Sequence, residues 1–475
     1  MRKLLSAIIV IFFISPIALS QEYRIAKGRV TDSLSIPGSE KETFSLFAPS
    51  NYSTDKQWPV IFVFDPKGRG RNVSGLFQPA AENQGYLVAS ANIDLTKRPI
   101  DSILTTATSM MRTVMTAFSV NPELVYAAGL GEGAQIASAL PIFYKDIAGV
   151  MAIGNSFVNR DMVNRNNPYM FIGVGGNQDY MVYQIEEYLR FFDKLGFPTD
   201  VYYFEGREDQ WPESDVISNA MSGFTLQAIR QGKRNSDEEF RRYLFEKELA
   251  YAEKLRRTRN YFSAYQKLER MEDKYDDFGF DDEIKEKMKE VKAPRNFNSQ
   301  RREFRQATQY EKEQQDEYEF LMRTDIMSAN FENIGWWAYQ MDELDKLKEN
   351  PSEAKSNMAY RLHGYLDFIS RREFDAIMKV RAPIDTKMFI AVLRTVINKT
   401  DPEAYFKIIS LASLDGDTET ALLYLEDLLK TGYSNREALY NIEGTLGLRM
   451  TPEFNSIIEK YLEESKFPAE APVDN

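Results

Sequence analysis

Six short apolar runs with helical stretches between them constrain the fold of the first half of the chain more than any other feature. The runs have the length of buried strands, and they cover residues 59–64, 85–90, 124–128, 149–153, 170–174 and 200–204. Helical patterns lie between most of them, for example over 103–118 and 183–195. Apolar strands that alternate with helices indicate a parallel sheet covered on both faces. Residues 24–33 and 42–48 are expected to form a leading antiparallel pair, so the predicted fold class is α/β with a mostly parallel sheet.

After about Asn235 the strand pattern stops, and the chain becomes charged, amphipathic and helical. A short motif with a small Ala recurs there at 260–264, 372–376 and 417–421. It resembles the turn and second helix of tetratricopeptide-type repeats, most closely over 402–463. The intervals are irregular, so the prediction is an irregular helical-repeat array, with an ordinary helical bundle as the alternative.

The first residues have the pattern of a secretory signal peptide. Arg2 and Lys3 precede an apolar stretch over 4–14, and small residues follow at 18–20. The apolar stretch is short for a membrane span, although an uncleaved anchor is the alternative. The expected organisation is a signal peptide over 1–20, an α/β domain over 21–234, a helical region over 235–466 and a frayed tail over 467–475. The expected location is the periplasm or the outside of a bacterial cell.

Composition excludes several kinds of chemistry. The chain has no cysteine, one histidine (His363) and a formal net charge of −12. Disulfides, thiolate nucleophiles, cysteine-ligated metals and a histidine-rich zinc site are therefore excluded, and no cofactor is expected. The negative charge argues against nucleic acid and anionic membranes as partners. His363 lies in a helical stretch, where a packing or surface role is expected. The neighbouring tryptophans Trp336 and Trp337 are expected to be buried between helices rather than to form a ligand shelf.

A glycine-rich turn between a predicted strand and a predicted helix is the most informative motif. Gly129, Gly131 and Gly133 follow the run at 124–128. The spacing is that of a nucleophile elbow, G-x-S-x-G, with glycine in place of serine. The surrounding sequence is similar to the elbow of secreted esterase-like and polyhydroxybutyrate-depolymerase-like hydrolases, and this resemblance to the α/β-hydrolase superfamily covers roughly residues 22–232.

A dinucleotide-binding loop is the competing interpretation, because Gly129, Gly131 and Ala134 also satisfy G-x-G-x-x-G/A. That motif belongs in the first βαβ unit, with an acidic residue at the end of the next strand. Here two predicted strands of the sheet come first, and the next run ends in Gly154-Asn155. The context therefore favours the hydrolase elbow.

The resemblance implies a catalytic triad with the nucleophile at Gly131, the acid at Asp179 and the histidine at Arg207. Glycine has no nucleophile, and arginine stays protonated and cannot act as a general base. The resemblance therefore implies a degenerate triad, and no residue is predicted to be catalytic. The candidate binding residues of the old cleft are Gly129, Gly131, Glu132 and Arg207, which could hold an anion or a carbonyl at the helix N-terminus. Alternatively, Arg207 pairs with Glu132, Asp179 or Glu208.

Three functions remain open at this point. The first is an exported, non-catalytic protein whose helical repeats bind an exported or envelope protein. The second is a secreted esterase or peptidase with an atypical site, for which Ser156 and Glu132 are the available side chains. The third is a small-molecule binder at the vestigial cleft. The helical region could also be a lid on the first domain, in which case no partner is needed.

Overall fold

The computed structural model describes residues 23–39, 41–156 and 160–467, and these form two compact units. The first unit contains the chain up to Val174, Glu187–Tyr202 and Trp211–Ser236. The second contains Gly175–Glu186, Tyr203–Gln210 and the chain from Asp237 onward. The predicted signal peptide, and the predicted tail beyond residue 467, lie outside the described residues.

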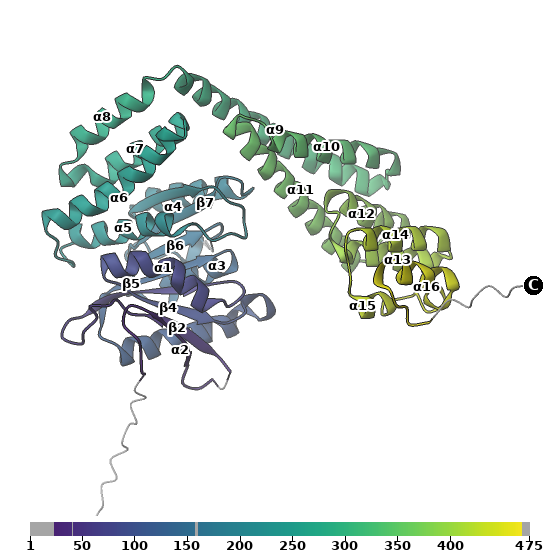
Figure 1. Ribbon diagram of the computed structural model, residues 1–475, viewed down its shortest axis with the longest axis horizontal. Helices are drawn as coiled ribbons and strands as arrows, with labels where there is room; N and C mark the ends of the chain where they lie inside the picture. Colours follow the sequence, from purple (N-terminus) through teal and green to yellow (C-terminus); the bar gives the residue numbers. More distant parts are fainter. Residues whose placement is uncertain (1–22, 40, 157–159, 468–475) are drawn as a thin grey trace, which may run out of the picture. The chain divides into compact units, whose positions relative to one another are not determined.

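An eight-stranded mixed sheet organises the first unit (Figure 1). Its order is β1-β2-β4-β3-β5-β6-β7-β8. β2 pairs antiparallel with β1 and with β4, whereas β4, β3, β5, β6 and β7 pair in parallel. The predicted strands and the leading antiparallel pair are confirmed, and the fold class is α/β-hydrolase-like with a mostly parallel sheet. The strands are β1 (Val30–Ser35), β2 (Thr43–Phe47), β3 (Trp58–Phe64), β4 (Leu87–Asn92), β5 (Val120–Leu130), β6 (Ile147–Ile153), β7 (Met170–Gly176) and β8 (Thr199–Phe204).

Helices cover both faces of this sheet. Every residue of β3 is buried, as expected for a central strand between two layers. Val60, Phe62 and Phe64 share one core with α2 and α3, and on the other face Phe224 of α5 stacks on Tyr126 of β5. The helices are α1 (Gly70–Gln84), α2 (Ile100–Ala117), α3 (Glu132–Phe143), α4 (Val182–Lys194) and α5 (Ser214–Arg230), with 3₁₀ turns η1 (Leu95–Lys97) and η2 (Arg160–Met162).

The chain from Asp237 onward is helical in its described residues, as the sequence predicts. Most neighbouring helices pack against each other, for example α6 on α7, α11 on α12 and α13 on α14, and two apolar cores follow, one among α9–α13 and one among α13–α16. The helices are α6 (Glu238–Arg257), α7 (Tyr261–Tyr275), α8 (Asp281–Lys292), α9 (Asn296–Ser328), α10 (Ile334–Lys348), α11 (Glu353–Lys379), α12 (Ile384–Ile397), α13 (Pro402–Asp415), α14 (Thr418–Lys430), α15 (Arg436–Tyr440) and α16 (Pro452–Leu462), with 3₁₀ turns η3 (Asp276–Phe278), η4 (Phe331–Asn333) and η5 (Leu448–Met450).

Two of the three repeat-like motifs lie at helix starts, and the third does not. Asn260 and Asp417 directly precede α7 and α14. Ala264 and Ala421, in the first turns of these two helices, are fully buried. The interpretation of 372–376 as a turn is wrong, because these residues lie inside the continuous helix α11. Arg259 and Gly416, next to the true turns, have positive φ, whereas none of the described residues of α11 does. Without such a break the helix simply continues.

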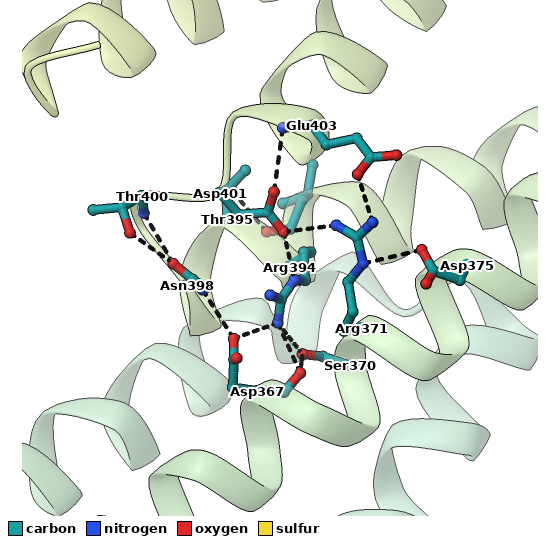
Figure 2. A network of polar contacts seen from close by, with 11 residues as sticks. Asp367, Ser370, Arg371, Asp375, Arg394, Thr395, Asn398, Thr400, Asp401 and Glu403 are labelled. Atoms are coloured by element: carbon teal, nitrogen blue, oxygen red, sulfur yellow. Dashed lines mark hydrogen bonds and ion pairs between the residues drawn. The ribbon is translucent and has the colours of Figure 1, made fainter. Parts of the chain in front are cut away.

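Buried polar networks join the helices of the second unit. In Figure 2, Arg394 of α12 donates to the Asp367 carboxylate and to Ser370 on α11, and to Asp401 at the start of α13. Trp337 is buried, as predicted, and its indole N–H donates to Asp325 at 2.9 Å.

Within the described part of the chain, no helix combines the length and the apolar composition needed to cross a bilayer.

Candidate functional site

The turn from β5 to α3 has the close backbone packing of a nucleophile elbow. A Cβ on Gly129 would lie 2.2 Å from the carbonyl carbon of Gly133, and a Cβ on Gly133 would lie 2.0 Å from the carbonyl oxygen of Phe64. Both positions therefore require glycine. β5 lies inside the sheet, after the β3–α1–β4 unit, so the turn is not in the first βαβ unit that a dinucleotide-binding loop occupies.

Gly131, at the predicted nucleophile position, has a strained backbone and free space around it. Its φ is +54° and its ψ is −116°, a conformation that other residues rarely adopt. A Cβ there would meet only Pro66, at 3.9 Å from Cγ. The predicted nucleophile position thus combines a strained backbone with open space. Glu132, the next residue, is exposed in the first turn of α3, where backbone N–H groups have no acceptor within the helix.

The loop between β3 and α1 does not supply the N–H group that completes an oxyanion hole in this fold. That hole combines the N–H after the nucleophile with an N–H from this loop. Pro66 has no N–H. The N–H groups of Lys67 and Arg69 donate to the carboxylate of Asp65 at 3.1 and 2.9 Å, and that of Gly68 donates to the Asp65 carbonyl. The N–H groups of Lys67, Gly68 and Arg69 therefore all donate to Asp65.

Asp65 is a buried anion with a full set of donors. Its side chain is 1% exposed and pairs with the Arg69 guanidinium at 2.8 Å. Trp211 donates its indole N–H to Asp65 Oδ1 at 2.8 Å. Burial alone would raise the pKa of Asp65, but the hydrogen bonds from Arg69 and Trp211 outweigh it and hold the pKa below its usual value. Asp65 is therefore a fixed structural carboxylate of this loop.

Ser156 is not poised as an alternative nucleophile. It is 5% exposed, and its hydroxyl donates to the hydroxyl of Ser138 at 3.0 Å. Among the residues described, no group of three or more His, Asp or Glu side chains is arranged to hold a metal ion.

Asp179, at the predicted acid position, belongs to the second unit. It is fully buried, and its Oδ1 accepts the N–H of Met181 at 2.7 Å. Its Oδ2 has no hydrogen-bond partner among the described residues. Burial raises the pKa of Asp179 to about 7; the charge of Glu208 adds to this, while the Met181 N–H and Arg361 oppose it.

Arg207, at the predicted histidine position, also belongs to the second unit and is exposed. Its guanidinium lies 5.6 Å from the ring centre of Tyr360, and the ion pairs of the described residues include none between Arg207 and Asp179 or Glu208. The alternative in which Arg207 pairs with Asp179 or Glu208 is therefore not observed. The loops that carry Asp179 and Arg207 do touch, because Gln178 N–H donates to the Gly206 carbonyl at 3.0 Å.

One face of α11 holds both loops. We call this face, formed by Tyr360, Arg361, Gly364 and Phe368, the α11 clamp. Phe368 stacks on Tyr180, with ring centres 5.1 Å apart. Gly364 allows close approach, since a Cβ there would lie 3.3 Å from the Tyr180 ring and 3.9 Å from Glu208 Oε2. The two loops after β7 and β8 are therefore packed on one helix of the second unit.

Arg361 is the centre of the α11 clamp. It is 6% exposed and forms a bidentate pair with Glu311 of α9, with Nε–Oε1 and Nη2–Oε2 distances of 2.8 and 2.6 Å. Its Nη1 donates to the Asn177 carbonyl at 2.5 Å, and its Nη2 donates to the Tyr183 hydroxyl at 3.2 Å. Arg361 thus ties α9 and α11 to residues 175–186, which comprise the end of β7, the connecting turn and the start of α4, and which we call the 175–186 loop.

His363, on the same helix, has a surface role, as expected. Its Nε2 lies 3.8 Å from Asp345 Oδ1, and its side chain is 32% exposed. Burial and the charge of Lys348 lower its pKa, which the neighbouring carboxylates partly offset.

Sequence reasoning finds the elbow but misses Asp65, Pro66 and Arg361. The stretch Asp65-Pro66-Lys67-Gly68 indicates only a loop. Arg361 is a charged residue in an amphipathic helix, and nothing nearby in sequence marks a contact with Asn177. A signal for Asp65 did exist: a carboxylate directly after a fully apolar strand lies at the carboxyl edge of the sheet, where ligands bind in this fold class.

No protein-family model and no curated protein matches the chain. Solved structures with a similar fold include Est1E from Butyrivibrio proteoclasticus, at 12% identity, covering 42% of this chain and 99% of that one, with a TM-score of 0.33. A thermophilic esterase, Est2, from Thermogutta terrifontis is 15% identical, covers 43% of this chain and 94% of its own, and has a TM-score of 0.33. S-formylglutathione hydrolase (FrmB) from Staphylococcus aureus is 10% identical, covers 42% of this chain and 98% of its own, and has a TM-score of 0.33. At such low identities and TM-scores the fold class rests on the strand order and pairing of the chain itself.

Proposed function

We propose that this chain is an exported α/β-hydrolase-like protein without catalytic activity, and that its helical region binds another protein. The observation that carries the first part is the elbow itself. Gly131 has the strained turn of a nucleophile position, yet it has no side chain, and the adjacent loop offers Pro66 in place of an N–H donor. Arg207 at the histidine position supplies no base. Loss of the nucleophile, the base and one oxyanion donor lowers the catalytic rate of a hydrolase by several orders of magnitude.

The purified protein is expected not to hydrolyse short acyl esters above background, and Gly131→Ser alone is expected not to change this. The added hydroxyl has no base to deprotonate it. Initial rates with a short-chain chromogenic ester measure both proteins. Turnover by the single variant would reveal another base and refute the proposal.

The proposed partner is an exported or envelope protein. The first 20 residues have the pattern of a signal peptide, and the hairpin of α13 and α14, closed by the buried Ala421, favours a repeat-type array. Such arrays expose extended surfaces that suit peptides and proteins. The net charge of −12 makes nucleic acid an unfavourable partner.

Crosslinking in the native envelope tests this partner. We expect intermolecular links from lysines of the helical region, for example Lys407 and Lys430, to a second protein. If the only links are intramolecular ones between the helices and the α/β domain, the helical region is a lid and the binding role is wrong.

A further inference from the structure

Asp179 is a buried carboxylate without a dedicated partner for its charge. Its exposed fraction is zero, one oxygen accepts a single backbone N–H, and the other oxygen accepts nothing from the described residues. Burial of an ionised carboxylate in this state is costly, so the neutral form is favoured. The residue lies in the 175–186 loop, which the α11 clamp holds.

Arg361 lowers the pKa of Asp179 through its charge, but this does not offset the effect of burial. The Nε and Nη2 atoms of Arg361 donate hydrogen bonds to Glu311 and Tyr183, and its Nη1 donates to the Asn177 carbonyl. Its charge is thus matched by Glu311, which is itself 1% exposed. An anion at Asp179 would be a second negative charge beside one buried guanidinium.

The other groups around Asp179 add negative charge. Besides burial, Glu208, from the loop after β8, raises the pKa of Asp179. Burial raises the pKa of Tyr180, and the charges of Asp179, Glu208 and Asp367 of α11 raise it further. The other charged or titratable groups near this segment include Tyr183 of α4, Glu311 of α9, Tyr360, Arg361 and His363 of α11, and Arg207 and Asp209 beside Glu208. Ionisation of Asp179 therefore works against the contacts that hold its loop.

We propose that the 175–186 loop is a proton-linked latch, which the α11 clamp holds while Asp179 is neutral and which loosens as Asp179 ionises. The stacking of Tyr180 on Phe368 and the Arg361–Asn177 bond are the contacts that open. The pKa of Asp179 is higher in the closed loop than in an open one. The closed state is therefore most stable, relative to the open state, in acid, and this stabilisation is lost as the pH rises through about 7.

Hydrogen exchange of the full-length protein tests the latch. We expect the protection factors of amides in the 175–186 loop, corrected for intrinsic exchange rates, to fall roughly tenfold between about pH 6 and about pH 8. Amides of β3 and β5 serve as an internal control and should keep their protection. Unchanged protection of the loop across this range would overturn the proposal.

Two variants separate the latch from a general effect of pH. Asp179→Asn should remove the pH dependence and give the loop more protection than the wild type at about pH 8. Glu208→Gln removes a neighbouring negative charge and should move the midpoint to lower pH. If either folded variant keeps the wild-type profile, Asp179 is not the titrating group and the proposal fails.

Discussion

Replacement of Arg361 by Met is expected to lower the free energy of unfolding of the second unit by about 3–5 kcal/mol. The variant keeps the volume of the side chain but leaves Glu311, at 1% exposure, as a buried charge without a cationic partner and with only the Tyr183 hydroxyl as donor. It also removes the donor to the Asn177 carbonyl. Denaturant unfolding of the full chain measures the loss, and hydrogen exchange shows which unit unfolds.

Two matched variants isolate the buried pair. Arg372→Met lies on the same helix, but its ion pairs with Glu319 and Glu373 are partly exposed, so the expected loss is about 0–1 kcal/mol. The double variant Arg361→Met, Glu311→Leu removes both charges and should recover most of the stability. A loss below about 1 kcal/mol for Arg361→Met would contradict the role given to the α11 clamp.

Gly133→Ala is expected to destabilise the first unit by about 3 kcal/mol, at the upper end of the cost of overpacking. The new methyl would lie 2.0 Å from the Phe64 carbonyl oxygen, so β3 or α3 must move. Thermal and denaturant unfolding of the full chain report this loss, again with hydrogen exchange to assign it to the first unit.

Gly131→Ala is the control for Gly133→Ala. Its methyl would have open space, with only Pro66 at 3.9 Å, so the cost is the strain of φ +54° alone, about 1–2 kcal/mol. Equal losses for the two variants would show that the tight packing described for this turn does not control its stability.

The strands were predictable from sequence because a central parallel strand is apolar along its whole length. The runs at 59–64 and 124–128 fall within β3 and β5 for this reason. The glycine-rich turn between β5 and α3 was predictable as well, since steric crowding at Gly129 and Gly133 permits no other residue. Local physical constraints of this kind leave a signature in the sequence.

The parts that could not be predicted depend on contacts between distant segments. Arg361 meets Asn177 across 184 residues of sequence, and no local pattern encodes that meeting. The turn expected at 372–376 failed for a different reason. An aromatic residue followed by a small Ala also occurs inside an unbroken helix, as Phe374 and Ala376 do in α11, and only a helix-breaking residue such as Gly416 distinguishes the two cases.

We propose that the turn at Gly131 has the backbone of a nucleophile elbow without the chemistry of one. Incubation of the purified protein with a fluorophosphonate probe, followed by intact mass measurement, tests it most directly, with an active serine hydrolase in the same tube as the positive control. The account predicts that the control gains the mass of one adduct and that this chain gains none. An adduct on any residue of this chain, Ser156 included, would show an activated nucleophile and contradict the account.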